Sequence, residues 1–201
     1  LVGDFGQASR PGALASWDEV LANVVVRTPP LQVTLSVNYR TPAEIMEVAN
    51  RLLPAAAPGV EPARPVRSTG AWPEVRTVSD DALVATAADA ARAAASGGGT
   101  IAVIAPTGMH AALTAALDDR GAVAGTVEAL DAPIGVLSAL DSKGLEFDHV
   151  VVVEPVRLVD PDRAGLRMLY VVLTRATRTL TVVHAEPLPE ALGLQSRNLT
   201  T

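Results

Sequence analysis

Two stretches in the C-terminal third decide the fold: Ser142-Lys-Gly-Leu-Glu-Phe-Asp148 and Leu169-Tyr-Val-Val-Leu-Thr-Arg-Ala-Thr-Arg178. The first is a polar turn that leads into His149–Val153, an apolar run with the length and β-branched composition of a buried strand. The second is an apolar helix that ends on arginines and leads into a strand over Thr179–His184. Together they place a lysine, a carboxylate and a guanidinium at one edge of a sheet. Nucleotide sites in α/β proteins are built at such edges.

The residues before these stretches continue the alternation of strands and helices. Hydrophobic residues make up 49% of the chain but aromatic residues only 3%, so the core must consist of Val, Leu, Ile and Ala. This pattern predicts an α/β fold with a mainly parallel sheet flanked by helices on both faces. The further predicted elements are strands over Val75–Val78, Thr100–Ala105 and Val136–Leu140, and helices over Asp80–Ser96, Thr107–Arg120 and Arg163–Arg175.

The N-terminal third has weaker signals. Capping boxes at Ser16–Glu19 and Thr41–Glu44 each predict the start of a helix. A strand is predicted over Gln32–Val37, and the Pro- and Ala-rich segment Pro54–Pro73 is predicted to be a long loop. The chain opens without Met inside the strand-like piece Leu1–Asp4, which we interpret as part of a longer protein.

Composition excludes several classes of site. The chain has no cysteine, and its three histidines lack the spacing of a metal pair. A net charge of −6 provides no basic field for nucleic acid, so any such contact must be local. No signal peptide or long apolar run is present, and the sequence predicts a cytoplasmic protein with no membrane partner. Lys143 is the sole lysine and no glycine loop precedes it, which excludes a G-x-x-x-x-G-K-[ST] phosphate loop.

Four ordered segments resemble conserved motifs of UvrD/Rep-type superfamily 1 helicases. They correspond to motifs III, IV, V and VI and read Val2-Gly-Asp-x-x-Gln7, Leu35-x-x-Asn-Tyr-Arg40, Lys143-Gly-Leu-Glu-Phe-Asp148 and Leu169-Tyr-Val-x-x-Thr-Arg-Ala176. The segment Thr41-Pro-Ala-Glu-Ile-Met46 is most similar to the actinobacterial HelD/HelR branch of RNA-polymerase-associated motor ATPases. The resemblance implies a RecA-like fold.

The same resemblance implies a division of the chain into two parts. Residues 1–30 would be a remnant of a first RecA-like domain, and residues 31–201 would be the second RecA-like domain. In this family ATP lies between two such domains. Gln7 and the arginines Arg40 and Arg175 would be the catalytic residues that reach the γ-phosphate. Mg²⁺ would be held by the N-terminal RecA-like domain, which is the expected partner.

The remaining implied site residues bind the rest of the nucleotide. Tyr39 would stack on the adenine, and Glu146 would hydrogen-bond the ribose. Lys143 and Gly144 belong to the same nucleotide-binding turn, where the lysine would order the turn rather than act chemically. Further expected partners of the full-length protein are RNA polymerase, DNA, or both.

Several departures from the family pattern shape the prediction. Motifs I and II are missing, so the chain alone should be inactive as an ATPase. No aromatic residue follows Gln7 within Ala8–Ala13, and Ser138-Ala-Leu140 stands where helicases carry Thr-x-His. The interval from Arg40 to Lys143 has no room for the large insertion of UvrD-like helicases. These differences favour the polymerase-associated function. The alternatives are a DNA-unwinding UvrD-type helicase domain and a catalytically degenerate RecA-like binding module.

Overall fold

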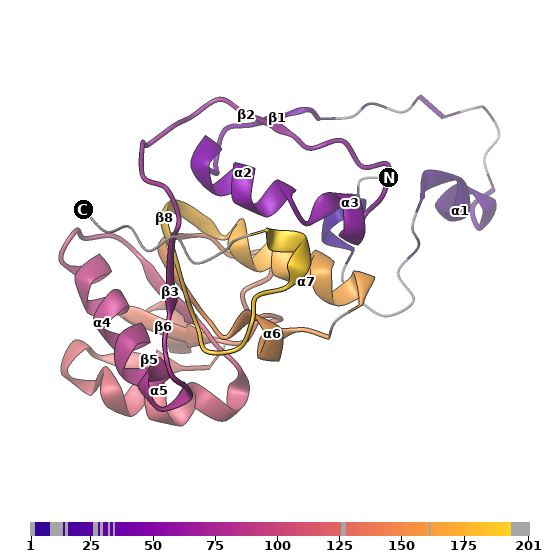
Figure 1. Cartoon of the computed structure of the whole chain (residues 1–201). Helices are drawn as coiled ribbons and strands as arrows, with labels where there is room; N and C mark the ends of the chain where they lie inside the picture. Colours follow the sequence, from indigo (N-terminus) through magenta and orange to yellow (C-terminus); the bar gives the residue numbers. More distant parts are fainter. Residues whose placement is uncertain are drawn as a thin grey trace.

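The computed structural model describes residues 3–8, 14, 16–25, 28, 30–31, 33, 35–125, 128–160 and 162–193. Its centre is a six-stranded, all-parallel sheet with the strand order β3-β8-β7-β4-β6-β5 (Figure 1). The predicted α/β class with a mainly parallel sheet flanked by helices is therefore confirmed. The strands are β3 Glu74–Thr77, β4 Ile101–Ile104, β5 Ala122–Ala124, β6 Ile134–Leu137, β7 Phe147–Val153 and β8 Ala176–His184.

Helices cover both faces of this sheet (Figure 1). They are α2 Ala43–Asn50, α3 Leu53–Ala56, α4 Leu83–Ala95, α5 His110–Ala116, α6 Pro155–Leu158 and α7 Arg163–Leu173, with a separate α1 at Trp17–Ala22. Short 3-10 helices occur at η1 Phe5–Gln7, η2 Asp80–Ala82, η3 Thr107–Met109, η4 Asp118–Arg120, η5 Glu128–Leu130 and η6 Glu190–Leu192.

The alternation of side chains along each strand produces two separate cores. In β7, Val150 and Val152 pack with α2 and α7, whereas Val151 and Val153 pack with α4 and α5. Successive residues of a strand point to opposite faces, so a continuous valine run supplies both cores at once. This explains why the strands read as unbroken apolar runs, as is typical of buried parallel sheets.

The α7 helix is fixed at its start by a side-chain cap and a close backbone contact. Asp162 accepts a hydrogen bond from the Gly165 N–H at 2.7 Å, which satisfies one free donor of the first turn. A Cβ atom at position 165 would lie 1.8 Å from the carbonyl oxygen of Asp160, so only glycine fits there. The helix is therefore locked to the loop before it, which fixes the direction in which it reaches Arg175.

The predicted strand over Gln32–Val37 is only partly seen. Gln32 and Thr34 lie outside the described residues, and the strand β1 covers Val37–Asn38. It pairs with β2, Arg64–Pro65, in a separate two-stranded sheet rather than joining the central one. Exposed apolar side chains precede it, with Leu31 and Leu35 each about nine-tenths exposed. The alternation of apolar and polar residues identified an extended segment. It could not show which strand this segment pairs with, because strand pairing is decided by the tertiary structure.

Two other local predictions are corrected. The loop predicted over Pro54–Pro73 contains α3 and β2. The capping box at Thr41–Glu44 does not form, because the buried Glu44 carboxylate accepts hydrogen bonds from Ser68 Oγ and from Gly70 N, the latter at 2.7 Å. The N–H of Ala43 donates instead to the carbonyl of Arg67 at 2.8 Å. A distant loop has replaced the local cap.

Two other local predictions agree with the structure, namely the capping box near the N-terminus and the glycine that was predicted to end a helix. Ser16 Oγ accepts a hydrogen bond from Glu19 N at 3.2 Å and caps α1 as predicted. Gly121 has a left-handed φ of 65°, as expected of the residue that ends a helical segment. β5 and α6 were not predicted, since each is too short to show a periodic pattern. Among the described residues, no helix has the length and apolar character needed to cross a membrane.

Candidate functional site

The predicted site residues gather at the edge of the sheet where β7 and β8 begin. Phe147 and Ala176 are partners in the parallel ladder, so the residues before them, Glu146 and Arg175, are neighbours. This is the amino-terminal edge of the two strands. Open α/β sheets usually bind ligands outside the carboxyl ends of their strands. Glu146 and Arg175 do share an edge, but it is the edge opposite to the one at which such sheets usually bind ligands.

Arg175 is buried and held by the backbone around it. Its side chain donates from Nε to the Val171 carbonyl at 2.9 Å and from Nη1 to the Leu145 carbonyl at 2.9 Å. Nη2 lies 3.3 Å from Thr174 Oγ1. Burial lowers the pKa of this guanidinium, while the nearby Glu146 carboxylate opposes that shift and Arg40 adds to it. A guanidinium has five N–H groups, so these bonds leave two donors on a rigidly oriented fork.

Arg40 lies on the opposite side of Glu146 and forms an ion pair with it. The Arg40 side chain is 58% exposed and that of Glu146 34% exposed, so the pair lies at the surface. The turn that presents Arg40 is built by Asn38, whose Oδ1 accepts from the N–H of Arg40 at 2.9 Å and of Thr41 at 3.1 Å. Asparagine closes such turns readily because its side chain can bond to the backbone just ahead of it.

The N-terminal segment carries Gln7 to the same place. Lys143 Nζ donates to the Gln7 carbonyl at 2.9 Å, which joins the turn after β6 to η1. The Gln7 side chain donates to Asp4 Oδ2 at 2.7 Å. Asp4 in turn is close enough to raise the pKa of Tyr170, although burial is the larger cause and brings that pKa to about 12. Motif III and the α7 helix are therefore in contact.

The turn at Lys143 depends on its flanking residues. Gly144 has a φ of 85°, a left-handed conformation that glycine adopts without strain. Ser142 is fully buried and donates from Oγ to the Ala139 carbonyl at 2.7 Å. The bond of Lys143 to the Gln7 carbonyl connects this turn to the segment beside it. Neither Lys143 nor Gly144 is shown to contact a ligand.

Tyr39 projects from the same turn as Arg40 and is 75% exposed. Taken together, the residues offer an exposed aromatic ring, a carboxylate and two guanidinium groups, of which that of Arg40 is exposed and that of Arg175 is buried. An aromatic ring suits a base, a carboxylate suits a ribose diol, and arginines suit phosphates. This set of groups fits one side of a nucleoside triphosphate. The resemblance implies that Arg40 and Glu146 contact different parts of the nucleotide, so their ion pair would have to open for both contacts to form.

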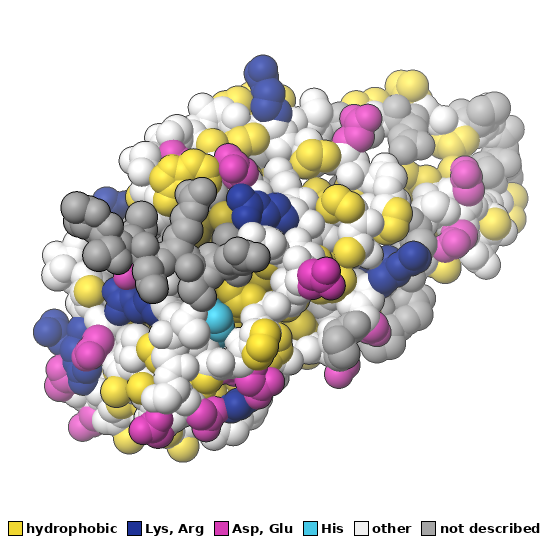
Figure 2. Space-filling model, in the orientation of Figure 1, with side chains coloured by type: hydrophobic (Ala, Val, Ile, Leu, Met, Phe, Trp, Pro, Cys, Tyr) yellow, Lys and Arg dark blue, Asp and Glu magenta, His cyan; other side chains and the backbone are white. Residues whose placement is uncertain are grey.

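The described residues hold no cluster of three or more His, Asp or Glu side chains that could bind a metal ion. Charged side chains of both signs are mixed over α4 and α5 in Figure 2, rather than gathered into one basic surface. A hollow of about 450 Å³ lies near the carboxyl end of β6, where Leu140 and Val156 line it beside Asp160 and Asp162. Arg157 also lines this hollow, so its lining carries charges of both signs.

Sequence reasoning missed three residues that organise the site. Asp4 and Asn38 lie within the quoted motifs, but their role is to hold Gln7 and the Arg40 turn in place. Arg167 donates from Nη1 to the Ala8 carbonyl at 3.0 Å and from Nε to the Ala56 carbonyl at 2.8 Å. No local sequence pattern identifies Arg167, because both of its acceptors lie in distant segments of the chain.

Comparison with known proteins supports part of the family assignment. Residues 135–183 match the family model of the UvrD-like helicase C-terminal domain. This region runs from β6 to β8, so it includes Lys143, Glu146 and Arg175 but not Gln7 or Arg40. No curated protein matches the chain.

A solved structure has a similar fold. It is the C-terminal domain of a possible DNA helicase from Lactobacillus plantarum, with a TM-score of 0.57 and 24% sequence identity. The match covers 78% of this chain and 92% of that one. The fold of this chain is therefore that of a helicase C-terminal domain, and its segment 135–183 is similar in sequence to the UvrD-like C-terminal family.

Proposed function

We propose that this chain is the C-terminal half of an ATP-dependent, superfamily 1 helicase-like motor. It would supply arginines and the adenine and ribose contacts to ATP and Mg²⁺ bound by an N-terminal RecA-like domain. The observation that carries the proposal is the meeting of Gln7, Arg40, Glu146 and Arg175, from four separate segments, at one edge of the sheet. The UvrD-like match over residues 135–183 supports it independently.

The proposed chemistry is stabilisation of charge during phosphoryl transfer. Charge spreads over the equatorial oxygens of the γ-phosphoryl group, and a guanidinium fork can neutralise it. Arg175 is held rigidly, and a fixed donor needs little reorganisation during the reaction. Arg40 is exposed and would swing from Glu146 onto the phosphate. Glu146 would then be released to accept a hydrogen bond from the ribose.

Hydrolysis would depend on closure of the two domains. The Tyr39 ring and the apolar side chains of Leu31, Val33 and Leu35 are each exposed and thus accessible to a partner domain. Arginines supplied by one domain to phosphate held by another couple the chemical step to domain movement. A motor requires this coupling.

We propose RNA polymerase bound to nucleic acid as the target of the full-length protein. The support is the resemblance of Thr41–Met46 to the polymerase-associated branch. Single-strand binding usually depends on base stacking, worth about 1–3 kcal/mol per base. The stretch after Gln7 contains no aromatic residue that could supply such stacking.

A DNA-unwinding helicase is the second candidate, because the similar solved domain comes from a possible DNA helicase. A strand-displacement assay on the full-length protein separates the two. Unwinding that needs no polymerase would support the second candidate. ATP-dependent release of polymerase from nucleic acid, without unwinding of free duplex, would support the first.

The ATP-binding role is tested with Arg40→Ala in a protein that includes the N-terminal domain. An arginine that contacts the γ-phosphate contributes roughly 10³ to 10⁵ in rate, so we expect at least a hundredfold loss of hydrolysis. Arg76→Ala is the matched control, because Arg76 also forms a surface ion pair, with Glu74 at 2.8 Å. Hydrolysis by Arg40→Ala within a few-fold of the control would show that Arg40 has no such role.

A further inference from the structure

We propose that Arg167 is a positioning residue that docks the Gln7 segment onto α7. Arg167 would then hold the Gln7 segment, which the resemblance assigns to the first RecA-like domain, beside the helix that leads to Arg175. The docking itself is a property of this chain alone. Its consequence for hydrolysis rests on the proposed function.

The segment that carries Gln7 has little structure of its own. Its single 3-10 turn is closed by hydrogen bonds from Gln7 N to Asp4 O at 3.2 Å and from Ala8 N to Phe5 O at 3.3 Å. A three-residue turn is too short to be stable in water without tertiary contacts. Bonds to the rest of the domain must therefore hold it in place.

Two cations supply these bonds from two different elements. Arg167 of α7 donates to the Ala8 carbonyl, and Lys143 of the turn after β6 donates to the adjacent Gln7 carbonyl. The carbonyl groups of two consecutive residues are thus each bound by a cation from a different element. In the described part of the chain, no carboxylate lies within ion-pair distance of Arg167, so its charge is directed at backbone oxygens.

The shape of the arginine side chain makes it suited to this role. Nη1 binds Ala8 while Nε binds Ala56, so one planar group bridges the Gln7 segment and the end of α3. A lysine has a single nitrogen and cannot bind both carbonyls in this geometry. Arg167 therefore connects three elements that are far apart in the sequence.

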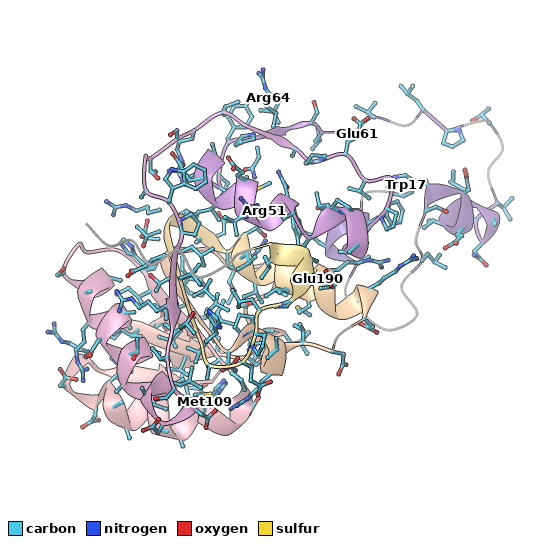
Figure 3. The ribbon with its side chains drawn as sticks, in the orientation of Figure 1. Trp17, Arg51, Glu61, Arg64, Met109 and Glu190 are labelled. Carbon is cyan, nitrogen blue, oxygen red and sulfur yellow. The ribbon has the colours of Figure 1, made fainter. Side chains whose placement is uncertain are left out.

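Apolar packing alone fixes the segment poorly. Phe5 contacts Trp17 edge to face, with ring centroids 5.3 Å apart, and Figure 3 shows Trp17 between α1 and α3. On its other side Phe5 borders a hollow of about 180 Å³ that Pro58 and Arg167 also line. A hollow next to the ring means lost packing contacts there. The polar bonds therefore carry much of the attachment.

The docking is tested by amide hydrogen exchange on this chain without nucleotide. Arg167→Ala should speed exchange in the peptide over residues 3–8 about tenfold, the change expected for loss of roughly 1.4 kcal/mol, near the lower limit for a charged hydrogen bond. Arg167→Lys should give a smaller increase. Arg163→Ala is the matched control, because it removes an exposed arginine that lies in the same helix and lines the same hollow but has no described hydrogen bond to the Gln7 segment.

Three results would overturn the docking role. They are exchange within twofold of the wild type, an equal increase in Arg163→Ala, or an increase spread evenly over the whole domain. If Arg167→Ala fails to fold, Lys143→Ala provides the second test, because it removes the bond to the adjacent carbonyl at 2.9 Å. Unchanged exchange in that variant would also contradict the proposal.

A kinetic test separates docking from the proposed function. In a protein that includes the N-terminal domain, Arg167→Lys should lower kcat for ATP hydrolysis with little change in KM, because a displaced Gln7 would act on the γ-phosphate step. Faster exchange without a kcat effect would confirm the docking and contradict the role of Gln7. Unchanged exchange would contradict the docking whatever the kinetics show.

Discussion

Replacing Arg175 by alanine should destabilise the isolated chain, apart from any effect on catalysis. The guanidinium is buried and donates to the carbonyls of Val171 and Leu145, both at 2.9 Å. The Val171 carbonyl would keep the Thr174 hydroxyl, which lies 3.0 Å away. No other described hydrogen bond reaches the Leu145 carbonyl, so the variant leaves a partly buried acceptor without a described protein partner.

The magnitude follows from these bonds. Leaving one buried polar group unpaired costs about 1–3 kcal/mol, and lost packing of the arginine stem adds to it. We expect a total loss of about 2–4 kcal/mol in the free energy of unfolding. For a domain of this size, 1 kcal/mol corresponds to roughly 2–4 °C, so Tm should fall by about 4–16 °C.

The assay is thermal and urea unfolding of the isolated chain, with Arg40→Ala as the comparison. Arg40 forms an exposed ion pair, and such pairs contribute only about 0–1 kcal/mol. Its variant should therefore melt within about 3 °C of the wild type. If Arg175→Ala melts as Arg40→Ala does, the hydrogen bonds to Val171 and Leu145 do not stabilise the fold as argued. Because Arg175→Ala is expected to destabilise the fold, the role of Arg175 in catalysis should be tested with Arg175→Lys instead.

Two further predictions concern stability. The Ser68 hydroxyl and neighbouring backbone N–H groups lower the pKa of Glu44 from 4.5 to about 2, so its stabilisation is fully present above pH 4.5 and is lost as pH falls towards 2. Glu44→Gln should cost about 1–3 kcal/mol at pH 7 by urea unfolding, and the difference from wild type should shrink below pH 4; a pH-independent difference would contradict this. Gly165→Ala should cost about 2–4 kcal/mol, because its Cβ would lie 1.8 Å from the Asp160 carbonyl oxygen. Unchanged urea unfolding would show that α7 can shift without penalty.

The residues of the candidate site were found from sequence, but their bonding was not. The resemblance to helicase motifs pointed to Gln7, Arg40, Glu146 and Arg175, and the structure brings them together. The residues that hydrogen-bond to them lie far away in the sequence, as Lys143 does from Gln7. No local sequence pattern predicts contacts between such distant residues. The roles predicted for these residues towards ATP remain predictions.

The sequence by itself determined the α/β class, because valine runs and helical periodicity are local signals that survive in any buried parallel sheet. It also determined most strand and helix positions from β3 to β8. Only the tertiary structure decided which edge of the sheet carries Glu146 and Arg175, since that depends on the order and direction of strands. It also decided that Glu44 binds a distant loop and that Arg167 bridges two segments, because each contact joins residues whose separation in sequence gives no hint of it.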